Sequence, residues 1–161
     1  MTASEFARVR NATNKEAACH WVCDRADDIL NSSSPDSISK SLLSVVCVET
    51  FFGEVCNGGF VQWLDNNHGR IAHRCPAALR RVGLPQYAEL AAQALRVHHP
   101  GPMPESIAAW EPALERIRDV HDSDDYASLE TTFFEHYHAN REEFRNRLFD
   151  YIVTHESEFM S

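Results

Sequence analysis

Apolar residues recur along most of the chain at spacings of three and four, which is the period of an amphipathic helix. No stretch longer than a few residues alternates between apolar and polar positions, as a half-buried strand does. The pattern therefore predicts an all-α fold, arranged as one compact bundle of roughly seven to eight helices. We expect a single domain over residues 1–161.

The N-terminal part of the chain contains one clear amphipathic helix. Thr13 and Glu16 have the spacing of a capping box, which would open that helix. Its apolar face is predicted to hold Ala18, Trp21, Val22, Ala26 and Ile29. Residues 32–36 read Ser-Ser-Ser-Pro-Asp and predict a short loop at its end.

The segment from Ile38 to Cys56 is apolar on more than one face, which predicts a long buried helix at the centre of the bundle. A strand around Val45–Val48 is the alternative, but the length of the segment favours a helix. Asn57, Gly58 and Gly59 then predict a tight corner between helices, because asparagine and glycine reach the left-handed backbone conformation at little cost.

Proline and glycine mark the boundaries of the later segments. Pro76 and Pro85 are each predicted to open a helix, and Gly83 to end the first of them. Residues 98–104 contain three prolines and predict an extended connection, after which residues 107–117 predict one or two helices. A helix is expected over 129–137, and Asn140 with Glu143 is predicted to cap a final helix that reaches Phe159.

The formal net charge is −9, and all of it falls in the last third of the chain. Residues 1–100 contain ten basic and ten acidic residues, whereas residues 101–161 contain five basic and fourteen acidic residues. Such an acidic surface repels the phosphates of nucleic acid within about 8 Å at physiological salt and attracts basic proteins. We therefore expect no direct binding to nucleic acid.

Motifs that carry chemistry are sparse. Cys19 and Cys23 lie one helical turn apart with His20 between them, but no second ligand pair recurs, so buried thiols are favoured over a metal site. A calcium loop counted from Asp122 lacks the required glycine and glutamate. Phosphate-binding loops and hydrolase motifs are absent, which weakens an enzymatic interpretation. We expect neither a metal nor a cofactor.

The remaining features of the sequence concern the cellular location of the protein and one cluster of basic residues. Five cysteines, no recognisable signal peptide and no uninterrupted 18-residue apolar run predict a cytoplasmic protein that does not span a membrane. A basic cluster interrupts the neutral part of the chain and is interpreted as a solvated helix face, with an anion site as the alternative. Its members are Arg70, Arg74, Arg80 and Arg81, with His68 and His73.

Residues 54–66 read Glu-Val-Cys-Asn-Gly-Gly-Phe-Val-Gln-Trp-Leu-Asp-Asn. This resembles the core motif of the all-helical DNA-mimic protein family of bacteria, V-x-N-G-G-F-x-Q followed by an aromatic residue. The resemblance extends over roughly residues 38–155, which leaves residues 1–37 as a helical extension. The motif positions are Glu54, Asn57, Gly58, Gly59, Phe60, Gln62, Trp63, Asn66 and Gly69.

The motif contains glycines, amides and aromatic residues rather than surface carboxylates, so we expect it to shape the fold. The glycines would form the turn, the amides of Asn57 and Gln62 would satisfy buried backbone groups, and Phe60 with Trp63 would fill the core. The resemblance itself implies a helical, often dimeric domain. In the family's namesake, an acidic surface imitates the phosphates of duplex DNA and occupies the DNA-binding face of a transcription factor.

Charge and resemblance together give the leading hypothesis, a non-enzymatic protein that binds a basic DNA-binding protein and forms a homodimer. The acidic surface that would bind the partner comprises Asp119, Asp122, Asp124, Asp125, Glu130, Glu135, Glu142 and Glu143. An immunity or antitoxin-like inhibitor of a basic nuclease is the second hypothesis. A small-molecule binder or enzyme with a pocket near Glu49, Asn57 and Gln62 is the third.

Overall fold

The computed structural model describes residues 1–32, 37–66, 69–98 and 124–160, and every regular element in these ranges is a helix. The expected all-α class is confirmed. The predicted connection after residue 98, the helices over 107–117, Asp119 and Asp122 lie outside the described residues. The helices are α1 (Ala3–Arg10), α2 (Lys15–Ser32), α3 (Lys40–Asp65), α4 (Gly69–Ala72), α5 (Cys75–Val82), α6 (Pro85–His98), α8 (Asp124–Ala139), α9 (Glu143–Thr154) and α10 (Glu156–Phe159).

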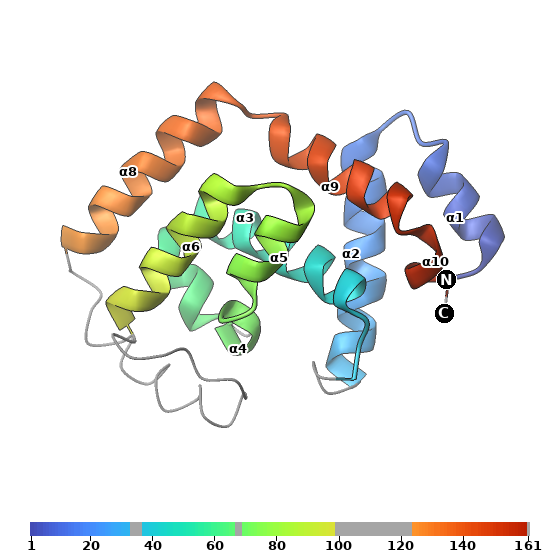
Figure 1. Ribbon diagram of the computed structural model, residues 1–161, viewed down its shortest axis with the longest axis horizontal. Helices are drawn as coiled ribbons and strands as arrows, with labels where there is room; N and C mark the ends of the chain where they lie inside the picture. The colour runs from blue at the N-terminus through green and yellow to red at the C-terminus, as the bar shows by residue number, and fades with distance from the viewer. Residues whose placement is uncertain (33–36, 67–68, 99–123, 161) are drawn as a thin grey trace.

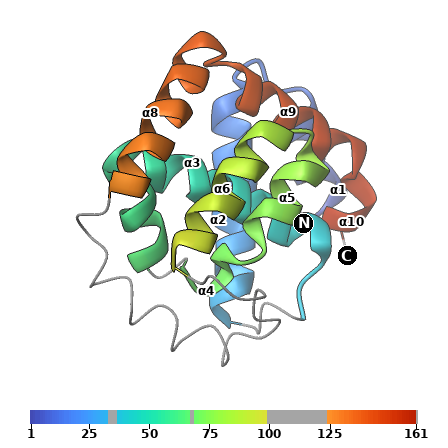
Figure 2. The ribbon, with the colours of Figure 1, turned by 60° about the vertical axis from the view of Figure 1, so that its left-hand side comes forward.

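Helix α3 is the long central helix that the apolar pattern predicted, and no strand occurs at Val45–Val48. It contacts α2, α4, α5, α8, α9 and α10, whereas α1 packs on α2, and α6 packs on α5 and α8, as can be followed in Figures 1 and 2. By length and composition α3 is also apolar enough to cross a membrane. However, 61% of its most apolar 18-residue stretch is buried inside the structure, as expected of a core helix.

The predicted corner at Gly58 and Gly59 is present as a break within α3. Gly58 has φ −156° and Gly59 has φ +79°, and neither conformation is helical. The break takes the amide of Phe60 out of the helical hydrogen-bond pattern. That amide instead donates to Glu130 Oε1 of α8, at 3.1 Å. A side chain at position 59 would collide with the same carboxylate, so glycine is required there for two reasons.

Aromatic side chains form the centre of the core around this corner. Phe60 and Trp63, which follow the break, are fully buried against Phe51, which precedes it. The ring centroids of Phe51 and Trp63 are 5.0 Å apart with the rings perpendicular, a favourable edge-to-face contact. Phe133 of α8 also packs on Phe51, at 5.8 Å. The predicted core role of Phe60 and Trp63 is confirmed.

Helix ends show where local sequence signals succeed and fail. Pro76 lies in the first turn of α5, and Gly83 ends that helix with φ +86°, both as predicted. Helix α2, however, is capped by Asn14, whose Oδ1 accepts from Ala17 N at 3.0 Å, so the predicted Thr13–Glu16 capping box is wrong. Ile29 is 39% exposed rather than part of the buried face of α2.

The predicted cap at Asn140 is also wrong. Its side-chain amide donates to His136 O at 3.3 Å, so it closes the end of α8 instead of opening α9. Helix α9 begins at Glu143 without a side-chain cap, and the final helix divides into α9 and α10. The same carbonyl also accepts the backbone amide of Asn140, at 3.1 Å, so the side chain and the backbone of Asn140 both close the last turn of α8.

Substitution of two glycines of α3 tests the corner. Gly59→Ala places a side chain at positive φ and displaces Glu130 from the Phe60 amide, and it should lower the free energy of unfolding by about 2–4 kcal/mol. Gly53 is exposed, and nothing lies within 4 Å of a Cβ added there. Gly53→Ala should therefore raise stability by about 0.5–1 kcal/mol.

Urea unfolding of both variants gives the two free energies. Equal changes for Gly59→Ala and Gly53→Ala would show that the corner imposes no special backbone requirement.

Candidate functional site

The predicted acidic surface is centred on α8 and the start of α9. Asp124 and Asp125 are the first two residues of α8, and helical spacing places position 124 on the same face as Glu135, eleven residues later. Glu135 and Glu142 are exposed, and within the described part of the chain no hydrogen bond or ion pair engages either carboxylate. These two carboxylates are free to meet a partner.

Glu130 is placed differently from the expected surface. It is half-buried on the flank of α8 that faces α3, and its carboxylate accepts the Phe60 amide at the Gly59 corner. A hydrogen bond between an ionised carboxylate and a backbone amide is among the stronger ones in proteins. Glu130 therefore joins α8 to α3, and its carboxylate is engaged within the chain.

Glu143 also faces the interior in part. Its Oε2 atom lies 3.8 Å from His136 Nε2 of α8, and both side chains are half-buried. When His136 is protonated the two groups form an ion pair across the α8–α9 junction. Of the four predicted carboxylates with described side chains, two are therefore exposed and two have contacts within the molecule.

One exposed carboxylate that sequence reasoning missed lies further along α9. Asp150 of α9 is exposed and, in the ranges that the structure describes, its carboxylate makes no hydrogen bond or ion pair. It lies two positions after Leu148 and two before Ile152, which are both buried. Helical periodicity in this segment was the signal that would have placed Asp150 on the solvent side.

A polar hollow of about 670 Å³ lies beside the Gly58–Gly59 corner. Glu54 Oε2 accepts from Gln62 Nε2 at 2.7 Å and from Asn66 Nδ2 at 2.6 Å, which fixes two amides at its edge. Gln62 thus binds a carboxylate rather than the buried backbone. The side chain of Asn57 is exposed and makes no hydrogen bond in the described structure, so its predicted role is wrong. The hollow is lined by Gly58, Val61, Gln62, Asp65, Asn66 and Glu130.

Glu49 does not line this hollow, so the structure does not assemble the pocket that was expected from Glu49, Asn57 and Gln62. Its side chain is 9% exposed and faces Arg145 Nη1 at 3.5 Å and His20 Nε2 at 3.6 Å. Arg145 in turn pairs with Glu16 at 2.9 Å. Burial raises the pKa of Glu49, although Arg145 and His20 partly offset that effect. The cluster connects α2, α3 and α9.

The cysteines do not form a metal site in the described residues, where no group of three or more histidine, cysteine or acidic side chains is placed to hold an ion. Cys19 and Cys23 are buried and reduced. Burial raises the pKa of Cys19 to about 12, so its thiol stays protonated and is a poor metal ligand at neutral pH.

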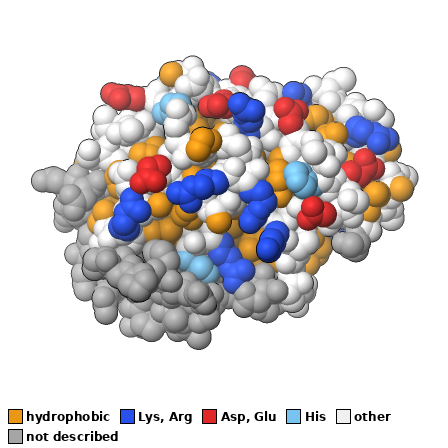
Figure 3. Space-filling view, in the orientation of Figure 1, with side chains coloured by type: hydrophobic (Ala, Val, Ile, Leu, Met, Phe, Trp, Pro, Cys, Tyr) orange, Lys and Arg blue, Asp and Glu red, His pale blue; other side chains and the backbone are white. Residues whose placement is uncertain are grey.

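Basic side chains gather over α5, α6 and the start of α3, as the blue groups in Figure 3 show, with acidic side chains among them. Glu89 pairs there with Arg96 at 2.8 Å and with Arg80 at 3.8 Å. Arg81 donates to Ser44 Oγ. Several of these cations thus have partners within the chain, which agrees with the interpretation of the basic cluster as a solvated helix face.

The comparison with known families gives a match over most of the chain. The family model described as DMP19-like protein matches residues 36–155, about three-quarters of the chain. The chain belongs to the DMP19-like protein family. This confirms the resemblance to DNA-mimic proteins, a family that is generally non-enzymatic. No curated protein and no solved structure matches the chain.

The buried carboxyl of this DMP19-like protein gives a prediction about pH. Because the pKa of Glu49 is raised in the folded state, the folded chain binds more protons than the unfolded chain just above pH 4.5. Stability from this group is therefore lost as pH rises above 4.5 and through the raised pKa of Glu49. Glu49→Gln should flatten that decline.

Urea unfolding at several pH values measures the effect, with Glu135→Gln as a control that removes one exposed carboxylate. A decline that is equally steep in the wild type and in Glu49→Gln would exclude Glu49 as its source.

Proposed function

We propose that this protein binds a basic DNA-binding protein in the cytoplasm. It would occupy the face of that partner that otherwise contacts DNA. The observation that carries the proposal is the location of the charge, because residues 101–161 hold fourteen acidic and five basic residues while the rest of the chain is neutral. Membership in a DNA-mimic family supports it. Acidic groups on one region attract a partner whose own surface evolved to bind phosphates.

The exposed carboxylates of α8 and α9 provide the contact region in this proposal. Glu135 and Glu142 are free within the described residues, and Asp150 adds a third carboxylate on α9. Glu130 contributes indirectly, since it holds α8 against α3. A rigid helix presents charges at fixed separations, which a mimic of a regular phosphate array requires.

The amount of charge supports a homodimer as the active form. Duplex DNA carries one charge per about 1.7 Å of its axis, so one helical turn carries on the order of twenty charges. A single chain has a net charge of −9, and two copies have −18. A dimer that joins the acidic regions of two chains approaches the charge of one DNA turn.

Charge reversal tests the contact region. Glu135→Lys combined with Glu142→Lys should weaken capture of a basic protein from lysate by about tenfold or more, because it adds repulsion where attraction was. Capture by the wild type should fall steeply as salt rises, and duplex DNA should displace the captured protein. Affinity capture followed by mass spectrometry gives both the amount and the identity of the partner.

The matched control is Asp24→Lys with Asp28→Lys, two exposed positions of α2 that change the net charge by the same amount. If both double variants retain the partner equally, net charge and not the α8–α9 region governs binding. Salt-insensitive capture would contradict the proposal altogether. A captured nuclease in place of a transcription factor or chromosomal protein would favour the inhibitor function.

A further inference from the structure

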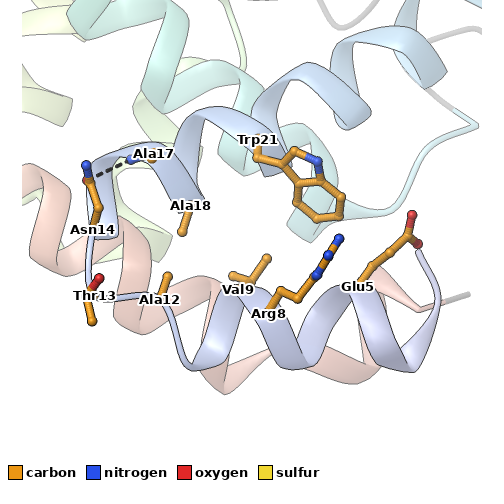
Figure 4. Close-up of a pocket in the computed structure, with 9 residues that line it drawn as sticks. All are labelled: Glu5, Arg8, Val9, Ala12, Thr13, Asn14, Ala17, Ala18 and Trp21. Carbon is orange, nitrogen blue, oxygen red and sulfur yellow. Dashed lines mark hydrogen bonds between the residues drawn. The ribbon is translucent and has the colours of Figure 1, made fainter.

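Helices α1 and α2 face each other across a cavity that the DNA-mimic function does not use. Figure 4 shows the cavity between α1 and the first half of α2, with the connecting residues Thr13 and Asn14 at one end. Its volume is about 360 Å³, within the range of sites that hold one small molecule. All nine lining residues fall between positions 5 and 21, outside the range that the family model matches.

The walls of the cavity are mainly apolar. Val9 of α1 and Ala12, just after α1, face Ala18 of α2, and the half-buried indole of Trp21 closes the end away from the connection. Alanine has no side chain beyond Cβ, so the two helices leave space between them that longer side chains would fill. An apolar, flat ligand would gain both burial and ring contact with Trp21.

The free charge at the edge of this cavity is positive. Arg8 is exposed, and within the described residues no hydrogen bond or ion pair engages its guanidinium. In Figure 4 the guanidinium lies between the indole of Trp21 and the carboxylate of Glu5. A guanidinium binds carboxylates and sulfonates through paired hydrogen bonds and also stacks on aromatic rings.

Glu5 does not cancel this charge through direct contact, because its carboxylate serves the start of α1. Glu5 Oε2 accepts from Thr2 N at 2.8 Å and from the Thr2 hydroxyl at 2.9 Å. The hydrogen bonds from Thr2 lower the pKa of Glu5, so it stays ionised and engaged there. An incoming anion is therefore drawn to the Arg8 side of the cavity.

We propose that the α1–α2 cavity binds a small aromatic anion. The ring would lie against Trp21 and the surface formed by Val9, Ala12 and Ala18, and the carboxylate would pair with Arg8. The apolar walls select the aromatic body, the cavity volume limits its size, and the unpaired guanidinium selects the negative group.

Titration calorimetry with 2-naphthoate tests the proposal on the full chain. The wild type should bind it, and Arg8→Gln should raise Kd by about fivefold or more, because the ion pair with the ligand is lost while a polar side chain is kept. Arg10→Gln is the matched control, since Arg10 lies on the same helix, pairs with Glu156 and does not line the cavity. It should leave Kd unchanged.

Two further measurements distinguish binding in this cavity from binding to other apolar surfaces of the protein. Ala17→Phe adds a ring at an exposed position that lines the cavity, so it should block binding without disturbing the core. Neutral 2-naphthol should bind the wild type more weakly than 2-naphthoate. The proposal is overturned if the wild type binds no naphthoate, if Arg8→Gln or Ala17→Phe binds as the wild type does, or if 2-naphthol binds equally well.

Discussion

The amide of Phe60 must find a hydrogen-bond acceptor outside α3, and the arrangement of the core depends on how that requirement is met. The backbone leaves helical geometry at Gly58 and Gly59, so Phe60 loses its usual acceptor one turn earlier. A buried amide without a partner costs about 1–3 kcal/mol. Glu130 supplies the acceptor from α8, which lies seventy residues further along the chain.

This single contact positions two groups of side chains. Because Phe133 follows Glu130 by three residues, both lie on one face of α8, and the helix that delivers the carboxylate also delivers a ring to the core. On α3, the break turns Phe60 and Trp63 back onto Phe51. The corner, the aromatic cluster and the docking of α8 are therefore mutually dependent, and a longer side chain at position 59 would disturb all three.

The sequence predicted well those features whose cause is local. The long apolar helix, the glycine corner and the Gly83 helix end each follow from the chemistry of adjacent residues. The Thr13 cap failed because the cap lies one position later, at Asn14, whose side chain bonds the Ala17 amide. The roles of Glu130 and Glu143 could not be predicted, since their partners are distant in sequence or lie across a helix junction.

The net charge of the chain is larger than the charge that its surface offers to a partner, because some carboxylates are bonded within the fold. Carboxylates that serve the fold, such as Glu49 and Glu130, count toward the net charge but do not lie free at the surface. A single α8–α9 surface therefore carries far fewer free carboxylates than one turn of DNA has phosphates. Residues 101–123 contain five more acidic residues, and a second chain would double the whole set. A binding surface that approaches the charge of DNA thus requires more than α8 and α9 of one chain.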